Sequence, residues 1–235
     1  MTSQTDASTP KRLLLWDIDS TLITTGGAGD KALKRVVAER FRVRDDFHDI
    51  EIAGRTDSGI AASILRKYGI DPTAEHVAEF LEDYLRQLAE LLPQLMGHVM
   101  PGVKEILDHV QPKADRVLAL LTGNLRRGAK LKLQRYGLWE YFDFGAFADD
   151  HQDRNELGAF ARARALEKHS HDFEVARIDV IGDTGHDIAC GKIFGARTIA
   201  VATGSWTREQ LAAHSPDFLF DDLSQVDEVI ARLDW

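Results

Sequence analysis

Four short, almost continuously apolar runs constrain the fold of this chain more than any other feature. Runs of this length without alternation are typical of strands that are buried on both faces, as in a parallel sheet. Segments with helical spacing of apolar residues separate the later runs, and this alternation predicts an α/β fold with a doubly wound parallel sheet. The runs are LLLWDI (13–18), RVLALLT (116–122), RIDVIGD (177–183) and RTIAVATG (197–204).

The stretch between the first and second runs is too long for one crossover connection. Its apolar residues recur at helical intervals and no strand is evident, which predicts an all-helical cap inserted after the first strand. Near the end of the chain, 217–220 is expected to add an edge strand and 226–233 a closing helix. The expected division is a disordered tail over 1–12, an α/β core over 13–22 and 96–235, and a helical cap over 23–95.

Acidic and small polar residues follow three of the predicted strands. Ligands of open α/β sheets bind beyond the carboxyl ends of the strands, so these residues should meet in one crevice. Several carboxylates together are costly without a cation, and a set of oxygen ligands suits Mg²⁺, which shares its shell with phosphate. The residues are Asp17, Asp19 and Thr21 after the first strand, Thr122, Gly123 and Asn124 after the second, and Asp183 and Asp187 after the third.

The pair Asp17 and Asp19 fits phosphoryl transfer. A carboxylate that attacks phosphorus forms an aspartyl-phosphate and splits one difficult step into two. A second carboxylate nearby can protonate the leaving oxygen and then deprotonate the attacking water. Thr122 and the backbone N–H groups after it can bind the phosphate. One cationic side chain would complete the site, and the candidates are Lys130 and Arg154.

At these residues the chain resembles the haloacid dehalogenase superfamily of hydrolases, and within it the phosphoglycolate phosphatase-like group. The group opens with Asp-x-Asp-x-Thr, which here reads DIDST (17–21). Its second motif is a Thr or Ser that ends a strand, here Thr122 in LLTGN, and its fourth is Gly-Asp-x-x-x-Asp, here GDTGHD (182–187). The helical insertion resembles the mobile cap of these enzymes, and GRTD (54–57) resembles a cap segment of the group.

The resemblance implies a Mg²⁺-dependent phosphatase acting on a small phosphorylated metabolite, with phosphoglycolate as the candidate from the family. It makes Asp17 the nucleophile and Asp19 the general acid/base, with Thr122 and Arg154 on the transferred phosphate. Asp17, Asp183, Asp187 and the backbone carbonyl of Asp19 would hold the metal. The candidate substrate-binding residues are Thr21, Gly123, Asn124 and Arg55.

Two positions depart from the pattern of the family. The residue after Asp19 is usually Gly and here is Ser20, which carries a modest cost if its φ is positive. The third motif is usually a Lys, whereas the corresponding place reads DRNEL, so Arg154 would carry the charge. Arginine keeps the charge but presents it as a planar fork. Lys130 is the alternative cation.

Composition limits the classes of partner. The chain has 29 Lys and Arg against 38 Asp and Glu, a formal net charge of −9, which argues against broad binding of nucleic acid or anionic membranes. The single cysteine, Cys190, excludes an internal disulfide and suits the cytosol. The first residues are polar with no apolar signal core, and no run approaches the length of a membrane span. A cytoplasmic enzyme is expected, and the sequence assigns it no oligomeric state.

Several other interpretations were weighed. A phosphomutase uses the same residues but returns the phosphoryl group to the sugar. A receiver-like signalling domain also gathers acids, a Thr and a Lys at strand ends, but the helical insertion and Asp19 argue against it. The stretch GAGDKA (27–32) matches a dinucleotide fingerprint, yet it does not directly follow the first strand, and a hinge into the cap is favoured. Arg55 equally fits a structural ion pair.

Overall fold

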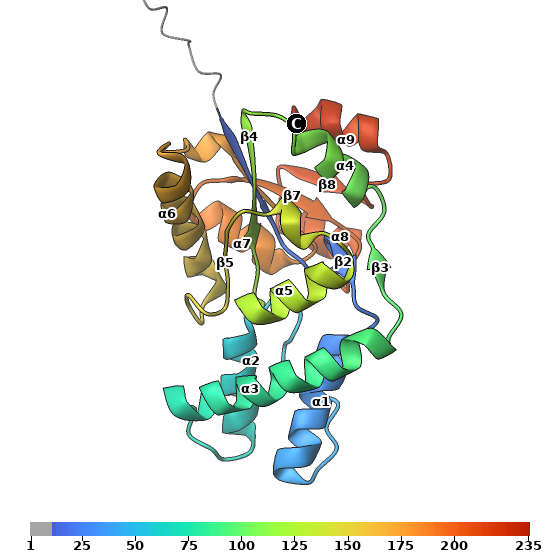
Figure 1. The fold of residues 1–235 in the computed structure, drawn as a ribbon, viewed down its shortest axis with the longest axis vertical. Helices are drawn as coiled ribbons and strands as arrows, with labels where there is room; N and C mark the ends of the chain where they lie inside the picture. The colour runs from blue at the N-terminus through green and yellow to red at the C-terminus, as the bar shows by residue number, and fades with distance from the viewer. Residues whose placement is uncertain (1–10) are drawn as a thin grey trace, which may run out of the picture.

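A six-stranded parallel sheet forms the centre of the molecule in the computed structural model, which describes residues 11–235. The strands run in the order β5-β4-β1-β6-β7-β8, all parallel, with β1 between β4 and β6 (Figure 1). The predicted α/β fold is therefore confirmed, including the edge strand. The strands are β1 (Arg12–Trp16), β4 (Arg116–Leu121), β5 (Gly145–Ala146), β6 (Ile178–Gly182), β7 (Arg197–Val201) and β8 (Phe218–Phe220).

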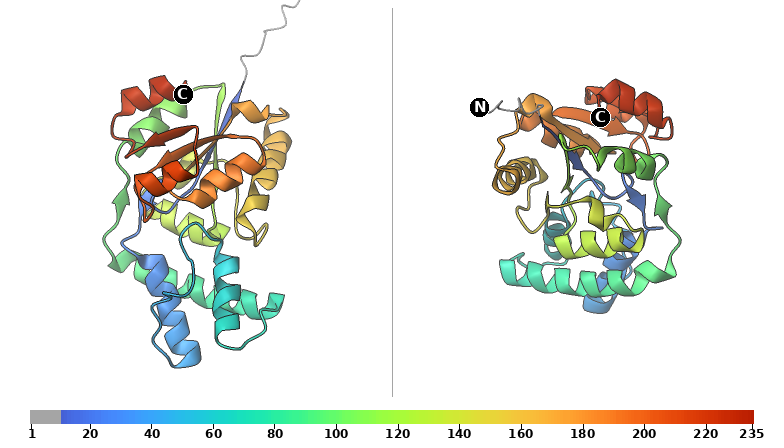
Figure 2. Two further views of the ribbon diagram at one scale, coloured as in Figure 1. Left: turned by 180° about the vertical axis from the view of Figure 1, so that it is seen from behind. Right: turned by 45° about the horizontal axis from the view of Figure 1, so that its top comes forward.

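Helices cover both faces of the sheet, because successive side chains of β1 point to opposite faces. Leu14 and Trp16 pack with α4 (Val103–Val110), α5 (Arg126–Arg135) and α9 (Val226–Leu233). Leu13 and Leu15 pack with α6 (Leu157–His169) and α7 (Gly185–Ile193), and α8 (Arg208–Ala213) packs beside α7. Seen from behind, α7 and α8 lie in front of the sheet (Figure 2, left). Short 3-10 turns are η1 (Leu92–Gln94), η2 (Trp139–Tyr141), η3 (Arg154–Glu156) and η4 (Val175–Arg177).

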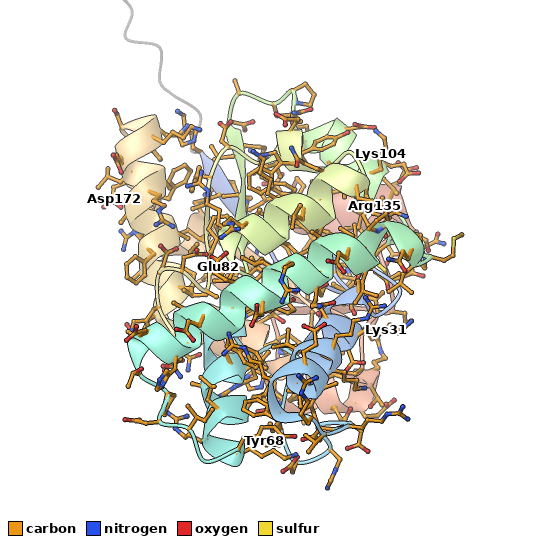
Figure 3. All side chains as sticks on the ribbon, turned by 60° about the horizontal axis from the view of Figure 1, so that its bottom comes forward. Lys31, Tyr68, Glu82, Lys104, Arg135 and Asp172 are labelled. Carbon is orange, nitrogen blue, oxygen red and sulfur yellow. The ribbon has the colours of Figure 1, made fainter. Side chains whose placement is uncertain are left out.

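Three helices form a separate layer at the carboxyl end of the sheet, which we call the helical module. They are α1 (Ala28–Phe41), α2 (Asp57–Lys67) and α3 (Ala74–Leu91), and they enclose an apolar cluster of their own. Figure 1 shows this layer below the sheet, with α5 between them. Figure 3 shows α3 alongside α5, with Glu82 and Arg135 labelled on the two helices. The module is therefore placed to cover the ends of the strands.

The two connections to the helical module run side by side. β2 (Ile23–Thr24) pairs antiparallel with β3 (His98–Val99), one strand on each connection. Gly26 has φ 65°, and a Cβ there would lie 2.2 Å from the carbonyl oxygen of Met96. This close approach of two backbones explains why a glycine follows β2. Strands of two residues carry too little periodicity to be recognised, so β2, β3 and β5 were not expected from the sequence.

The start of the sheet differs from the expected tail over 1–12. Residues 1–10 lie outside the described part of the chain. Arg12, which was assigned to the tail, is the first residue of β1, is 5% exposed, and forms an ion pair with Asp179 of β6 at 3.2 Å. A charged residue in an otherwise polar stretch gives no sign of burial until its partner on a distant strand is known. Within residues 11–235, no helix combines the length and apolarity needed to cross a membrane.

Candidate active site

Three carboxylates meet beyond the carboxyl ends of the two central strands β1 and β6. Asp17 follows β1 directly and Asp183 follows β6, while Asp187 lies in the first turn of α7. Each offers an oxygen, and these oxygens all lie within 4.8 Å of one another. All three side chains are buried. The parallel pairing of β1 with β6 brings Asp17 and Asp183 to the same edge, as expected from the sequence.

Local structure fixes the second and third of these carboxylates. The Thr184 backbone N–H and hydroxyl donate to Asp187 at 3.0 and 2.7 Å, so Asp187 caps the start of α7. A Cβ on Gly182 would lie 2.0 Å from the Asp187 carboxyl carbon, so only glycine fits at the end of β6. The Thr21 hydroxyl donates to Asp183 at 3.2 Å. Thr21 was expected to bind substrate, whereas in this structure it holds a carboxylate.

Arg154 is the cation beside these acids. Its guanidinium donates to Asp17 at 2.8 Å, to the carbonyl of Gly54 at 3.1 Å, and also to Asp187. It is 7% exposed, and its turn η3 is anchored because Cys190 on α7 donates its thiol to the carbonyl of Arg154 at 3.2 Å. The residue expected at the third motif therefore lies against the candidate nucleophile.

The charges at this centre are not balanced by the protein alone. Burial raises the pKa of Asp17 to about 6, although Arg154 opposes the shift. Burial and the neighbouring charges of Asp187 and Asp17 hold the pKa of Asp183 well above its usual range. Burial would lower the pKa of Arg154, but the charges of Asp187 and Asp17 outweigh it and raise that pKa. Three carboxylates surround a single arginine, which leaves an excess of negative charge. Their oxygen atoms are suitable ligands for a divalent cation such as Mg²⁺.

The second motif forms a hydrogen-bonded turn after β4. The side chain of Asn124 donates to the Thr122 hydroxyl and to Asp19, each at 2.9 Å. Thr122 is fully buried and Asn124 is 5% exposed, whereas the Asp19 carboxylate is 44% exposed. Gly123 has no room for a side chain, because a Cβ would lie 2.2 Å from the carbonyl oxygen of Arg55. The Thr122–Asn124 turn thus lies between Asp19 and the helical module.

The alternative cation Lys130 is not at the site. Its side chain is exposed and its Nζ lies 6.0 Å from the centre of the Trp139 ring. The lysine two residues later, which the sequence analysis did not single out, is buried at 3% exposure and donates to Asp19 at 2.6 Å. Lys132 shares a helix face with Gly128, Ala129 and Leu133, which are buried. That spacing in the sequence was the available signal, because a lysine on the apolar face of a helix must find a partner.

The Gly54–Asp57 segment of the helical module lies across the site. The Asp57 backbone N–H donates to the carbonyl of Gly123 at 2.7 Å, and its carboxylate accepts from the Leu125 N–H at 2.8 Å. Asp57 of the helical module therefore holds the residue that precedes α5. Burial raises the pKa of Asp57 to about 6, partly offset by the charge of Lys132. Arg55 lies 3.9 Å from Glu51 and is about half exposed, so its ion pair is weak.

A cavity of about 300 Å³ lies between the sheet and the helical module. Asp17, Asp19 and Asp183 line one end of it. Side chains of the helical module line it as well. They are Arg55, which the sequence analysis named, and Asp57 and Tyr84, which it did not. The volume suits a small molecule, and the acids at one end suit a metal-bound anion.

Ser20 occupies the turn in which the family has glycine. Its φ is 63°, in the left-handed region, and its N–H donates to the carbonyl of Ile23 at 2.7 Å. The hydroxyl of Thr203 donates to the carbonyl of Ser20 at 2.6 Å. A non-glycine residue here carries a modest conformational cost, and these two hydrogen bonds hold the turn.

The parallel sheet, the inserted helices and the acids at the strand ends are those of a hydrolase of the haloacid dehalogenase type. A model of the haloacid dehalogenase-like hydrolase family matches residues 14–192, and the chain belongs to this family. The resemblance of the motifs is confirmed, and the enzyme is a phosphoric monoester hydrolase.

Known proteins similar to this chain cover almost all of it. It is 28% identical over 224 residues to the protein named "Probable phosphatase IndB" of Dickeya dadantii (strain 3937), covering 92% of each. It is 26% identical over 232 residues to a phosphoglycolate phosphatase of Vibrio vulnificus (strain CMCP6), covering 93% of this chain and 96% of that protein. The solved structure of a hydrolase from Pseudomonas syringae matches with a TM-score of 0.75 at 17% identity, covering 95% of this chain and 99% of that one.

Proposed function

We propose that this enzyme is a Mg²⁺-dependent phosphatase that hydrolyses a small phosphorylated metabolite through an aspartyl-phosphate on Asp17. The position of Asp17 carries the proposal. Its carboxylate is buried at the end of the central strand, 2.8 Å from Arg154, and lines the cavity together with Asp19. A phosphate group in this cavity would contact both Asp17, the proposed nucleophile, and Asp19, the proposed proton-transfer group, because both follow strand β1.

In the first step, a carboxylate oxygen of Asp17 forms a bond to phosphorus while the bond from phosphorus to the leaving oxygen breaks. Asp19 supplies the proton that the leaving oxygen needs. In the second step, water attacks the phosphorus of the aspartyl-phosphate, Asp19 takes the proton of the water, and the bond to Asp17 breaks. Arg154 holds Asp17 in position and neutralises phosphoryl charge, and the Thr122–Asn124 turn supplies hydrogen-bond donors.

Asp17, Asp183 and Asp187 would hold the metal, together with the backbone carbonyl of Asp19. Mg²⁺ supplies counter-charge for these carboxylates and for the phosphoryl oxygens. Thr21 keeps Asp183 in place, and the capping of α7 keeps Asp187 in place. The helical module acts as the cap, which excludes bulk water and contacts the leaving group.

Phosphoglycolate is the first substrate to test. The cavity is small, and Arg55 on its lining offers positive charge for a carboxylate on the leaving group. Several relatives of this length, including the one from Vibrio vulnificus, are named phosphoglycolate phosphatases. Hexose phosphates belong in the same panel, because the phosphomutase alternative would act on them.

Phosphate release from this panel, with Mg²⁺ or with EDTA, tests the proposal. Asp17→Asn is the matched variant, since it removes the nucleophilic oxygen and keeps the shape of the side chain. We expect release that needs Mg²⁺ and falls by at least about 10³-fold in Asp17→Asn. No release from any member by folded protein with Mg²⁺ would overturn the proposal. Conversion of a hexose phosphate only with a bisphosphate activator would instead identify a mutase.

A further inference from the structure

Lys132 is the second buried cation at the site, and it contacts a different carboxylate from Arg154. Its Nζ donates to Asp19 at 2.6 Å and to the side-chain carbonyl of Asn124 at 2.6 Å. The side chain is 4% exposed. Arg154 instead pairs with Asp17 and Asp187. The two carboxylates of the first motif are thus each held by a cation of their own.

Solvent could stabilise Asp19 without Lys132. The Asp19 carboxylate is 44% exposed, so water can reach it. Burying the ammonium of Lys132, in contrast, removes its hydration, which is unfavourable unless hydrogen-bonded partners compensate for it. The pair therefore does more for the geometry of Asp19 than for its solvation. Asn124 adds to this, because its amide donates to Asp19 and its carbonyl accepts from Lys132.

The Nζ of Lys132 also lies close to residues of the helical module that line the cavity. A Cβ on Gly29 would lie 3.4 Å from the Tyr84 hydroxyl and 3.8 Å from the Lys132 Nζ. Gly29, Tyr84 and Lys132 all line the cavity with Asp19. Gly29 leaves this space open. The leaving group of a bound phosphate ester would lie between Asp17 and these groups, within reach of Asp19.

We propose that Lys132 is a positioning residue, which holds the Asp19 carboxylate where it transfers its proton to the leaving oxygen. The inference rests on the proposed phosphatase reaction. Lys132 keeps its three protons throughout: the leaving oxygen takes its proton from Asp19, and Asp19 regains one from the attacking water. Loss of Lys132 should therefore matter most for the steps in which Asp19 moves a proton.

The leaving group provides the test. An alkyl phosphate such as phosphoglycolate releases an alkoxide that must be protonated, whereas acetyl phosphate and p-nitrophenyl phosphate release anions that are stable in water. We would measure the first turnover of each by rapid quench, with Mg²⁺ and enzyme in excess. The variants are Lys132→Met and Lys132→Arg, with Lys130→Met as the matched control on the exposed face of the same helix.

We expect Lys132→Met to slow the first turnover of the alkyl phosphate by about 10- to 100-fold, and that of the activated esters by about threefold or less. In a separate steady-state measurement with substrate in excess, turnover of the activated esters should slow as well, because Asp19 must also deprotonate water. Lys132→Arg should restore part of the loss, and Lys130→Met should behave as wild type. If Lys132→Met does not fold, Lys132→Gln takes its place.

Equal slowing of both kinds of substrate, or no slowing, would overturn the role of Lys132 while leaving the phosphatase reaction in place. A wild-type enzyme that is folded with Mg²⁺ and consumes none of the substrates would instead overturn the proposed function itself, and this inference with it.

Discussion

At the scale of single residues, the site depends on cations paired with particular acids. Arg154 takes the place where the family usually has lysine, and its planar fork contacts Asp17, Asp187 and the carbonyl of Gly54 together. A lysine presents one point charge and could not make all three contacts with the same geometry. The arginine therefore links the proposed nucleophile Asp17 both to the helical module and to Asp187, a proposed metal ligand.

Replacing Arg154 should affect both stability and rate. Arg154→Met leaves Asp17 and Asp187 buried without their cation, which typically costs about 3–5 kcal/mol of unfolding free energy. Arg154→Lys should retain measurable activity, reduced by about 10-fold or more, because it keeps the charge and loses the fork. Urea unfolding and kcat measure the two effects, with Lys130→Met as control. Wild-type stability and rate in Arg154→Met would contradict this account of the ion pairs.

At the scale of elements, the Gly54–Asp57 segment joins the helical module to the second-motif turn. Asp57 is the first residue of α2, and its carboxylate accepts from the N–H of Leu125, the residue before α5. Gly123 permits this approach, since its backbone lies against the carbonyl of Arg55. The position of the helical module and the shape of the Thr122–Asn124 turn therefore depend on each other.

Gly123→Ala should break this link. The added Cβ would lie 2.2 Å from a backbone oxygen, so the two segments must separate. We expect kcat/KM for the phosphorylated substrate to fall by about 10-fold or more, with faster proteolysis in the helical module. Steady-state kinetics and limited proteolysis measure these. Unchanged kinetics would mean that the segments can part without affecting the site.

Asp57→Asn should change how stability depends on pH. The folded protein raises the pKa of Asp57 from 3.8 to about 6, so the folded state binds more protons between these values. Stability from this group is therefore present at low pH and is lost as pH rises through about 6, by up to about 3 kcal/mol. The unfolding free energy of Asp57→Asn minus that of wild type, measured in EDTA, should therefore increase as the pH is raised from 4 to 7. A constant difference across this range would contradict the shift.

At the scale of the whole molecule, the acidic centre makes the fold sensitive to metal. The pKa values of Asp17 and Asp183 are both raised in the folded protein. Without metal, the folded state therefore binds protons at these carboxylates more strongly than the unfolded chain does. Stability from Asp17 falls as pH rises through about 6, and the raised pKa of Asp183 acts in the same direction. A bound divalent cation would reverse this, because it binds the ionised carboxylates.

Mg²⁺ should therefore stabilise the enzyme more at pH 7 than at pH 5. At a concentration of 100 times its Kd, the ion would add about 2.7 kcal/mol to the unfolding free energy. Thermal melting with Mg²⁺ or EDTA at both pH values measures the effect. In Asp183→Asn the response to Mg²⁺ should be largely lost. An equal response in this variant would place the metal elsewhere.

Periodicity and motif order along the chain were enough to predict the sheet, the helical insertion and the places of Asp17, Thr122 and Asp183 at the strand ends. Near-continuous apolar runs mark buried parallel strands, and the carboxyl ends of such strands meet at one edge. The order of the motifs gave the family. None of this needs contacts between distant side chains, because it follows from period, order and strand direction.

The pairing of each cation with its acid could be learned only from the folded structure. Lys130 and Lys132 are two residues apart on one helix, and although helical spacing places Lys132 on the apolar face, it does not show that Asp19 is its partner. Thr21, Asp57 and Arg12 likewise have roles set by distant partners, Asp183, Leu125 and Asp179. Pairing energies depend on burial and distance across the fold, and a single sequence carries neither quantity.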